Sequence, residues 1–350
     1  MREDTLLWST TIRKASFTTR MFEGKLTARI VAAMLLFGTC GVLTQAAPHP
    51  FFQRGVNFTA EWPVGYDPAR AAKILGQLPR YGINAIALVP YGFERKNSPD
   101  VHFGGGWERE DLIRNLTAMA HRKGMKVFLK PQIWYQEGFP GDIDFHSEAD
   151  RARWFSGYRR FILHWADEAA AAHSDLFAVG VEFVCLSRYE SEWRRIIAEA
   201  RKHYHGPLTY AANSGPDFED ARFWDALDYI GLNEYYPLPG NLSFSAVLRT
   251  VETVQKRYHR PVIFPEAGFA SIAGSHHHPW DETPTKLSLD EQARCYDTLL
   301  KAFYKKPWFQ GVYWWKVGTN GFGGPNDSSL TPWGKPAMQI VANWYRNGGR

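Results

Sequence analysis

Two glutamates at the ends of short apolar runs are the residues whose type and placement most clearly allow chemistry. Glu182 follows the run 179–181, which reads Val-Gly-Val, and Glu266 follows the run 262–265, which reads Val-Ile-Phe-Pro. Short β-branched runs are typical of buried strands, so each carboxyl should lie where a strand leaves the core. Two carboxyls that face one pocket can supply a proton donor for a leaving oxygen and a nucleophile or base for a sugar carbon. The pair therefore predicts the chemistry of glycoside hydrolysis.

The elements that must position these carboxyls alternate along the chain. Strand-like runs are predicted at 55–58, 85–90, 126–131, 176–182, 208–213, 229–233, 262–266 and 311–315. Helical patterns lie between them at 68–81, 109–123, 148–172, 190–203, 243–258, 289–304 and 335–345, with a weaker one at 217–227. Eight strands, each followed by a helix, in about 300 residues predict an α/β fold, a (β/α)8 TIM barrel, in one domain spanning 48–350. An open doubly wound sheet is the rival. It usually has a glycine-rich phosphate turn after its first strand, which residues 55–59 do not provide.

Polar and aromatic residues gather just after these apolar runs. In a (β/α)8 barrel the active site lies at the carboxyl ends of the strands, so these positions should share one rim. The predicted substrate-binding residues are Asn57, Trp62, Lys130, Gln132, Trp134, Asn213, Asn233, Tyr235, Tyr236, Trp280 and Trp314. Aromatic rings can cover the flat C–H faces of sugars while polar groups bind the hydroxyls. For any single Trp, core packing is an equal alternative, and for Lys130 the alternative is a buried ion pair with a rim carboxylate.

The two glutamates should have different roles. Glu182 is the predicted general acid/base, because a neighbouring carboxylate and apolar walls would raise its pKa. Glu266 is the predicted nucleophile, held ionised by rim donors such as Tyr235 or Tyr236. The alternative for each is a strand-end Glu in a salt bridge. A carboxyl separation of about 5–5.5 Å would give retention of configuration, and about 6.5–9.5 Å would give inversion.

Neighbouring positions compete with these assignments. Because side chains alternate along a strand, Glu234 and Tyr235 cannot both point inward, and Glu234 is expected behind the site or as a hydroxyl-binding group. Glu61 suits a substrate contact or a salt bridge equally well. On the last strand, Trp314 is expected to form the floor of the pocket and Trp315 to point into the layer between barrel and helices.

The stretches around these residues resemble a known group of enzymes, the retaining glycoside hydrolases built on the (β/α)8 barrel, and within it glycoside hydrolase family 113, the β-mannanases. The resemblance covers nearly the whole chain after residue 48. It is carried by residues 55–58 (GVNF), 127–131 (VFLKP), 179–183 (VGVEF), 208–213 (LTYAAN), 228–237 (DYIGLNEYYP), 264–268 (FPEAG), 279–280 (PW), 313–315 (YWW) and 334–337 (GKPA). It implies an acid/base after the fourth strand and a nucleophile after the seventh.

The sequence departs from this group at one position. Many members place Asn immediately before the acid/base, where it holds the sugar 2-hydroxyl, and Val181 stands there in this chain. Asn213 or Asn233 are candidates for that role. The sugar preference is therefore less firmly implied than the chemistry.

The N-terminal residues 1–47 read as an export signal. Arg29 precedes the apolar stretch 30–43, and residues 44–47 (Thr-Gln-Ala-Ala) supply small residues for cleavage. Met21 would give a more usual start than Met1. Cys40 allows a lipid anchor, but its context favours cleavage near Ala46 or Ala47. The expected location is secreted or periplasmic.

Charge and cysteine content limit the partners. Residues 1–46 hold six Lys or Arg and three Asp or Glu, so the rest of the chain has 35 basic and 33 acidic residues and a net charge of +2. This gives no reason to expect binding of nucleic acid, or of a membrane beyond export.

Cys185 and Cys295 could form one disulfide or remain two separate thiols. The run 276–278 (His-His-His) belongs to a long loop, where it is expected to cover the cleft, and consecutive His do not converge on one ion. We expect no metal or cofactor, and a monomer.

These observations together predict an exported retaining glycoside hydrolase that acts on a β-linked oligosaccharide or polysaccharide. By resemblance the substrate is β-1,4-linked mannan or a mannose-containing glycan. A β-glucanase, a β-mannosidase or another exo-acting glycosidase would keep the chemistry and change the sugar. A non-catalytic carbohydrate-binding barrel is the alternative of another class. The high aromatic content, with 14 Trp among 350 residues, is consistent with all of these.

Overall fold

Eight parallel strands close into a barrel in the computed structural model, which describes residues 52–106, 108–136 and 138–347. The order around the barrel is β1-β11-β10-β9-β8-β7-β5-β2, and β2 pairs with β1 to close it. The barrel strands are β1 (Gln53–Thr59), β2 (Ala85–Leu88), β5 (Lys126–Leu129), β7 (Leu176–Val181), β8 (Leu208–Asn213), β9 (Ile230–Glu234), β10 (Val262–Ala267) and β11 (Phe309–Gly318). The predicted (β/α)8 fold is confirmed.

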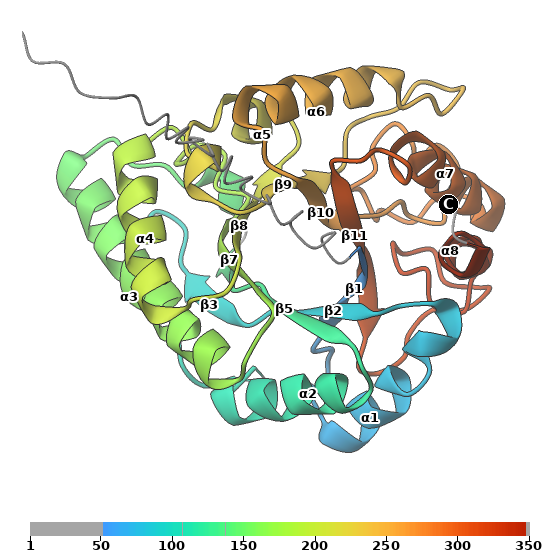
Figure 1. The fold of residues 1–350 in the computed structure, drawn as a ribbon, viewed down its shortest axis with the longest axis horizontal. Coiled ribbons are helices and arrows are strands. Elements are labelled where there is room, and N and C mark those ends of the chain that lie inside the picture. The colour runs from blue at the N-terminus through green and yellow to red at the C-terminus, as the bar shows by residue number, and fades with distance from the viewer. Residues whose placement is uncertain (1–51, 107, 137, 348–350) are drawn as a thin grey trace, which may run out of the picture. The chain divides into compact units, whose positions relative to one another are not determined.

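Helices surround this ring of strands (Figure 1). They are α1 (Pro68–Leu75), α2 (Glu110–Arg122), α3 (Glu148–Ala171), α4 (Glu190–His203), α5 (Pro216–Asp220), α6 (Ser245–Tyr258), α7 (Leu289–Phe303) and α8 (Pro336–Asn347), with short 3-10 turns at Leu78–Tyr81, Pro140–Asp142 and Trp224–Ala226. Local signals set several starts. Asp67 accepts a hydrogen bond from the backbone of Arg70 before α1, and Ser147 accepts one from the backbone of Asp150 before α3. No helix among the described residues is both long and apolar enough to cross a membrane.

A small three-stranded sheet, absent from the sequence prediction, stands beside the barrel. It is formed by β3 (Tyr91–Glu94), β4 (Val101–His102) and β6 (Gln132–Tyr135), with β3 in the middle. The predicted strands 85–90 and 126–131 stop short, at Leu88 and Leu129, and the chain starts new strands after Pro90 and Pro131. Proline has no N–H to donate to a neighbouring strand, which explains the break at both places.

The fifth helix is shorter than the pattern 217–227 predicts. The chain forms only the five residues of α5 and then the turn Trp224–Ala226. The first helical pattern, 68–81, is also divided, because α1 ends at Leu75 and a separate 3-10 turn follows it. Cys185 and Cys295 are two separate free thiols, which settles the open question of a disulfide between them.

The core lies between the strands and the helices, with a smaller group of side chains inside the barrel. Inside, Phe128 and Tyr313 pack edge to face at 5.2 Å among three alanines, Leu176 and Ile263. On the side of α3 and α4, aromatic rings interlock around Tyr158, whose ring stacks on Trp154 at 4.9 Å and meets the edge of Phe183 at 4.9 Å. This packing supports the end of β7, where Glu182 lies.

The close approach of β8 and β9 gives a test of the barrel. A Cβ on Gly231 would lie 2.2 Å from the carbonyl oxygen of Tyr210, which is backbone and cannot swing aside. We expect Gly231→Ala to lower the free energy of unfolding by about 1–3 kcal/mol, measured by urea denaturation. Gly240→Ala is the matched control, because a Cβ there meets nothing within 4 Å, and it should change stability by less than about 0.5 kcal/mol. Equal unfolding midpoints for the two variants would contradict the register between β8 and β9.

Candidate active site

A cavity of about 790 Å³ opens among the carboxyl ends of the barrel strands, and both predicted catalytic glutamates border it. Its lining residues are Gln132, Phe139, Glu182, Asn213, Ser214, Gly215, Tyr235, Tyr236, Pro237, Glu266, Trp280, Glu282, Trp315 and Leu330. The volume suits several sugar units, and the lining combines aromatic rings with a few polar groups.

Glu266 lies on β10 with both carboxyl oxygens occupied by donors. The ammonium of Lys130 donates to its Oε1, and the hydroxyl of Tyr235 donates to its Oε2 at 3.1 Å. The side chain is only 4% exposed. An ammonium and a hydroxyl that both donate to a carboxyl are contacts that suit a carboxylate rather than a neutral acid. The carboxylate is the state that a nucleophile needs.

Lys130 follows β5 and is completely buried. Its ammonium also lies 5.0 Å from the centre of the Trp315 ring, which gives it a cation–π contact. Burial lowers the pKa of Lys130, and the charges of Glu266 and Glu182 oppose that decrease. Lys130 therefore forms a buried ion pair with Glu266, which confirms the ion-pair alternative considered for this residue.

Glu182 comes directly after β7 and has a left-handed backbone, with φ of 58°. Its Oε1 accepts hydrogen bonds from the side-chain amides of Asn213 at 3.2 Å and Asn233 at 3.1 Å. Burial raises the pKa of Glu182 to about 7, and the negative charge of Glu266 contributes to the increase. The hydrogen bonds from the two amides and the charge of Lys130 lower the pKa of Glu182 and so oppose this increase.

The two carboxyls thus differ in the way that glycoside hydrolysis requires. Glu182 can carry a proton near neutral pH, while Glu266 is paired with the ammonium of Lys130. Both border the same cavity. The arrangement can protonate a glycosidic oxygen from one side and attack the anomeric carbon from the other.

The comparison with protein families agrees with this geometry. The sequence model of Glycoside Hydrolase Family 113 matches residues 59–323. The chain belongs to glycoside hydrolase family 113. It is therefore a glycosidase, and the resemblance seen in the sequence is confirmed.

Solved structures of the same family share the fold of this glycosidase. A family 113 β-mannanase from Alicyclobacillus acidocaldarius, in complex with ManMIm, is 30% identical with a TM-score of 0.78, over 85% of this chain and 98% of that one. A second family 113 β-1,4-mannanase is 27% identical with the same TM-score, over 85% and 99% of the two chains. A family 5 mannosidase from Rhizomucor miehei, 15% identical with a TM-score of 0.56 over 86% and 94%, shares the fold alone. No curated protein sequence matches the chain.

Most of the predicted binding residues lie at or next to the cavity. Gln132, Asn213, Tyr235, Tyr236 and Trp280 line it. Asn233 is fully buried behind it and contacts Glu182. Tyr236 is fixed through its hydroxyl, which donates to Glu219 at 2.7 Å and accepts from the backbone of Gly215 at 2.9 Å.

The prediction for the two tryptophans of β11 was wrong. Trp314 is fully buried, stacks on Tyr296 of α7 at 4.1 Å and donates its N–H to Tyr345. Trp315 lines the cavity instead. Alternation along the strand is kept, but its phase places Tyr313 inside the barrel, Trp314 toward the helices and Trp315 toward the cavity.

Three other predicted binding residues do not line the cavity. Asn57 is fully buried and donates both amide hydrogens to backbone carbonyls, those of Pro265 at 3.0 Å and Tyr313 at 3.2 Å. It therefore braces the barrel. Trp62 is 74% exposed, and Trp134 is 60% exposed on the small sheet.

The competing glutamates have other partners. Glu61 forms an ion pair with Lys316 at 2.7 Å, which settles its two alternatives in favour of the salt bridge. Glu234 is fully buried and accepts a hydrogen bond from the backbone of Tyr236 at 3.2 Å, and burial raises its pKa to about 8. Glu234 does not line the cavity, whereas its neighbour Tyr235 does, as the alternation predicted.

The sequence reasoning missed several lining residues. Phe139, Ser214, Glu282 and Leu330 come from loops, where no periodic pattern shows which side chains turn toward the cavity. The loop with the three His is anchored by His276, whose Nδ1 lies 2.7 Å from Glu291. This anchoring holds the segment that carries Trp280.

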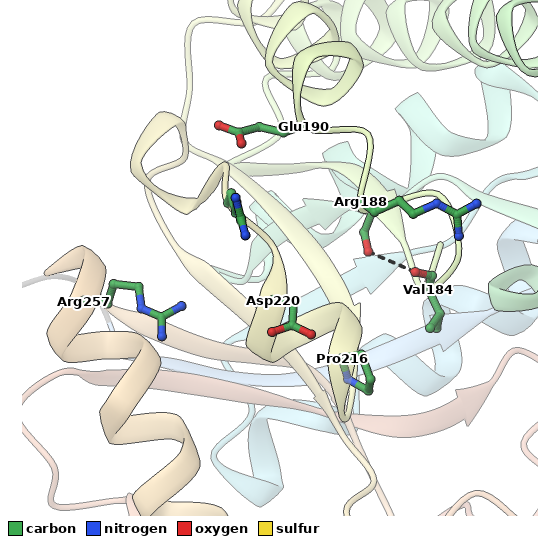
Figure 2. A pocket seen from close by; sticks show the side chains of 8 residues that line it. Val184, Arg188, Glu190, Pro216, Asp220 and Arg257 are labelled. Carbon is green, nitrogen blue, oxygen red and sulfur yellow. Dashed lines mark hydrogen bonds between the residues drawn. The ribbon is translucent and has the colours of Figure 1, made fainter. Parts of the chain in front are cut away.

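A second cavity, of about 720 Å³, lies on the other side of the segment that lines the active site. Its lining residues are Val184, Ser187, Arg188, Glu190, Pro216, Asp220, Arg222 and Arg257. In Figure 2, Arg257 of α6 and Val184 stand on opposite sides of it, with Asp220 and Pro216 of α5 between them. Residues 213–215 line the catalytic cavity and Pro216 lines this one, so the start of α5 forms a wall between the two.

The raised pKa of Glu182 predicts the alkaline limb of the pH profile. An acid that must donate a proton loses activity as pH rises through its pKa, so kcat/KM on a glycan should fall above about pH 7. The amide of Asn213 stabilises the charged form of Glu182. In Asn213→Ala the pKa should therefore rise, and the limb should move to higher pH. Gln132→Ala, which removes a lining side chain that makes no hydrogen bond to Glu182, is the control, and its limb should stay in place. A limb that moves to lower pH in Asn213→Ala would contradict this assignment.

Proposed function

We propose that this family 113 enzyme hydrolyses β-1,4-linked mannan or mannose-containing oligosaccharides and polysaccharides by double displacement, with retention of configuration. The observation that carries the mechanism is the contrast between the two carboxyls of one cavity. Glu182 has a pKa of about 7, and Glu266 is paired with Lys130 and Tyr235. The first can act as acid and base in turn, and the second as nucleophile.

The proposed reaction has two steps. In the first, Glu182 gives its proton to the glycosidic oxygen, the bond from that oxygen to the anomeric carbon breaks, and Glu266 forms a bond to the same carbon. In the second, Glu182 takes a proton from a water molecule, whose oxygen attaches to the anomeric carbon while the bond to Glu266 breaks. Lys130 and Tyr235 hold Glu266 in place, and Asn213 and Asn233 hold Glu182.

The groups around these carboxyls are proposed to bind the sugar. Trp280 lines the cavity and is 54% exposed, so its ring is free to cover a sugar face. Trp315 offers a second ring beside Lys130. Gln132 has a buried amide oxygen with no hydrogen-bond partner among the described residues, which a sugar hydroxyl would satisfy.

The sugar assignment rests on the relatives. Two family 113 structures with TM-scores of 0.78 are named as β-mannanases, and one of them is 30% identical to this chain. They support mannan over a β-glucan, which the sequence alone left open. Export through residues 26–47, cleavage near Ala47 and a monomeric state are proposed on the sequence alone. Residues 1–51 lie outside the described residues.

A substrate panel tests the proposed activity. The mature chain from Ala47 should release products from mannan, glucomannan and manno-oligosaccharides, and much less from cello-oligosaccharides, as read by mass spectrometry. Because double displacement retains configuration, NMR should show the β-anomer first. Initial formation of the α-anomer would contradict the two-step mechanism, and turnover of glucosides alone would contradict the sugar assignment.

Removal of either carboxyl tests the roles. We expect Glu266→Gln to lower kcat/KM on manno-oligosaccharides by about 10³-fold or more, and Glu182→Gln by about 10²–10⁴-fold, with unchanged circular dichroism. Glu234→Gln is the matched control. This carboxyl is equally buried, and its pKa of about 8 keeps it protonated at neutral pH, so an amide replaces it closely. Its kcat/KM should stay within about threefold of the wild type. If Glu234→Gln is as damaging as the other two, the assignment of the pair is wrong.

A further inference from the structure

Asp217 is a completely buried carboxyl that the reaction does not use. It lies on α5, just past the end of β8, and is 0% exposed. Its Oδ2 accepts the backbone N–H of Asn213 at 2.8 Å, and its two oxygens lie 3.2 and 3.1 Å from the hydroxyl of Tyr210. Ser187 is a further hydrogen-bond partner. A buried carboxyl that accepts several hydrogen bonds belongs to a polar network that fixes the positions of its members.

The first arm of this network ends at the residue after Glu182. Tyr210 is also fully buried, and its hydroxyl accepts the backbone N–H of Phe183 at 2.9 Å. A phenol hydroxyl has one hydrogen, so Tyr210 uses it on Asp217 and accepts from Phe183. Asp217 is therefore tied to the backbone that follows Glu182.

The second arm ends at the carboxyl of Glu182. The backbone of Asn213 donates to Asp217, and the side-chain amide of the same residue donates to Glu182 Oε1 at 3.2 Å. The position of Asn213 fixes one of the two amides that hold the carboxyl. One arm of Asp217 thus reaches the backbone N–H of the residue after Glu182, and the other reaches the carboxyl of Glu182 itself.

Glu182 needs this support because of its backbone conformation. Its φ of 58° lies in the left-handed region, which a residue other than glycine adopts only when its surroundings enforce it. The N–H of Glu182 is bound to the carbonyl of Ala211 on β8 at 2.9 Å, and the next N–H in the chain is bound to Tyr210. Two consecutive backbone N–H groups are therefore fixed by β8, the first by the carbonyl of Ala211 and the second by the hydroxyl of Tyr210, which Asp217 orients.

Because α5 has only five residues, its attachment to the barrel relies on a few individual contacts, among them the hydrogen bonds of Asp217. Pro216 and Asp220, at the two ends of α5, line the second cavity, so this side of the segment borders a cavity (Figure 2). The buried ring of Phe218 and the hydrogen bonds of Asp217 fix the segment to the barrel, together with the bonds of Gly215 and Glu219 to the hydroxyl of Tyr236. Among these contacts, those of Asp217 are the ones that reach Asn213 and Tyr210.

We propose that Asp217 and Tyr210 are positioning residues that hold Glu182 in the orientation for proton transfer. The inference rests on the proposed function, in which Glu182 is the general acid and base. Neither residue touches the substrate in this account. Their removal should harm the step that needs a proton from Glu182 and spare a step that does not.

The test compares two leaving groups in the full-length mature enzyme. A manno-oligosaccharide needs a proton on its leaving oxygen, whereas a 2,4-dinitrophenyl β-mannobioside loses a stable phenolate without one. For both, kcat/KM reports only the steps up to the departure of that group. We expect Tyr210→Phe to lower kcat/KM on the oligosaccharide by at least about tenfold and on the dinitrophenyl substrate by less than about threefold. Asp217→Asn should show the same pattern to a greater degree.

Tyr158→Phe is the matched control. Tyr158 is fully buried in the same aromatic cluster, contacts the ring of Phe183 and donates its hydroxyl to the carbonyl of Val179 at 2.9 Å. It has no hydrogen bond to either arm of Asp217. Removal of the Tyr158 hydroxyl should change kcat/KM on both substrates by the same small factor. Thermal unfolding of all variants measures any general loss of stability.

Each outcome decides the inference. Equal losses on both substrates in Tyr210→Phe, or a pattern like that of Tyr158→Phe, would overturn it, and so would unchanged rates. If Asp217→Asn does not fold, Tyr210→Phe alone decides. Glu182→Gln distinguishes a failure of the positioning role from a failure of the acid/base role: if it spares the dinitrophenyl substrate and Tyr210→Phe does not, only the positioning inference fails. If Glu182→Gln shows no dependence on the leaving group, the acid/base assignment itself fails.

Discussion

The buried ion pair of Lys130 and Glu266 is the interaction on which the rest of the site depends. Both side chains are almost fully excluded from water, and a charge in that position is tolerated only with a partner. The pair joins the end of β5 to β10, strands that lie on different sides of the barrel and 136 residues apart in the chain. Burial raises the pKa of Glu182, and the charge of Glu266 adds to that increase. The two carboxyls therefore differ through their surroundings, because only Glu266 accepts a hydrogen bond from the ammonium of Lys130.

Around this pair, polar groups are arranged in successive layers. Asn213 and Asn233 contact Glu182 directly, and Tyr235 contacts Glu266. Behind them, acids of the short helix α5 bind hydroxyls of two tyrosines, Asp217 that of Tyr210 and Glu219 that of Tyr236. The five residues of α5 thus hold two residues near the cavity, Tyr210 through Asp217 and Tyr236 through Glu219.

The barrel and the placement of both carboxyls could be predicted from the sequence, because they follow from local patterns. An apolar run of strand length ends where a polar residue begins, and parallel strands place such ends at one rim. The phase of alternation on β11 could not be predicted, since it depends on which neighbour each face meets. Residues 313–315 are all aromatic, so the sequence is equally compatible with Trp314 or with Trp315 facing the cavity.

The roles of buried polar residues also lay beyond local patterns. Asn57 sits at a strand end like a binding residue, but its partners are carbonyls of β10 and β11, more than 200 positions later in the chain. Tyr210 and Asp217 look unremarkable in sequence because their bonds form only when β7, β8 and α5 meet. Hydrogen bonds between distant segments have no periodic signature. The small sheet was missed because β3 and β6 follow directly on the predicted runs 85–90 and 126–131, and β4 has only two residues.

The pairing of the first strand with the last has a consequence for how the protein folds. β1 and β11 are joined along most of their length, and Asn57 ties this seam to β10 as well. The seam cannot form until residues up to about 318 are free to pair, so an incomplete chain carries two open strand edges. Contacts of such long sequence separation slow folding, because a large loop must close before any of them form. Ring closure is thus expected late on the folding pathway, and a growing chain depends on protection of those edges until its final strand arrives.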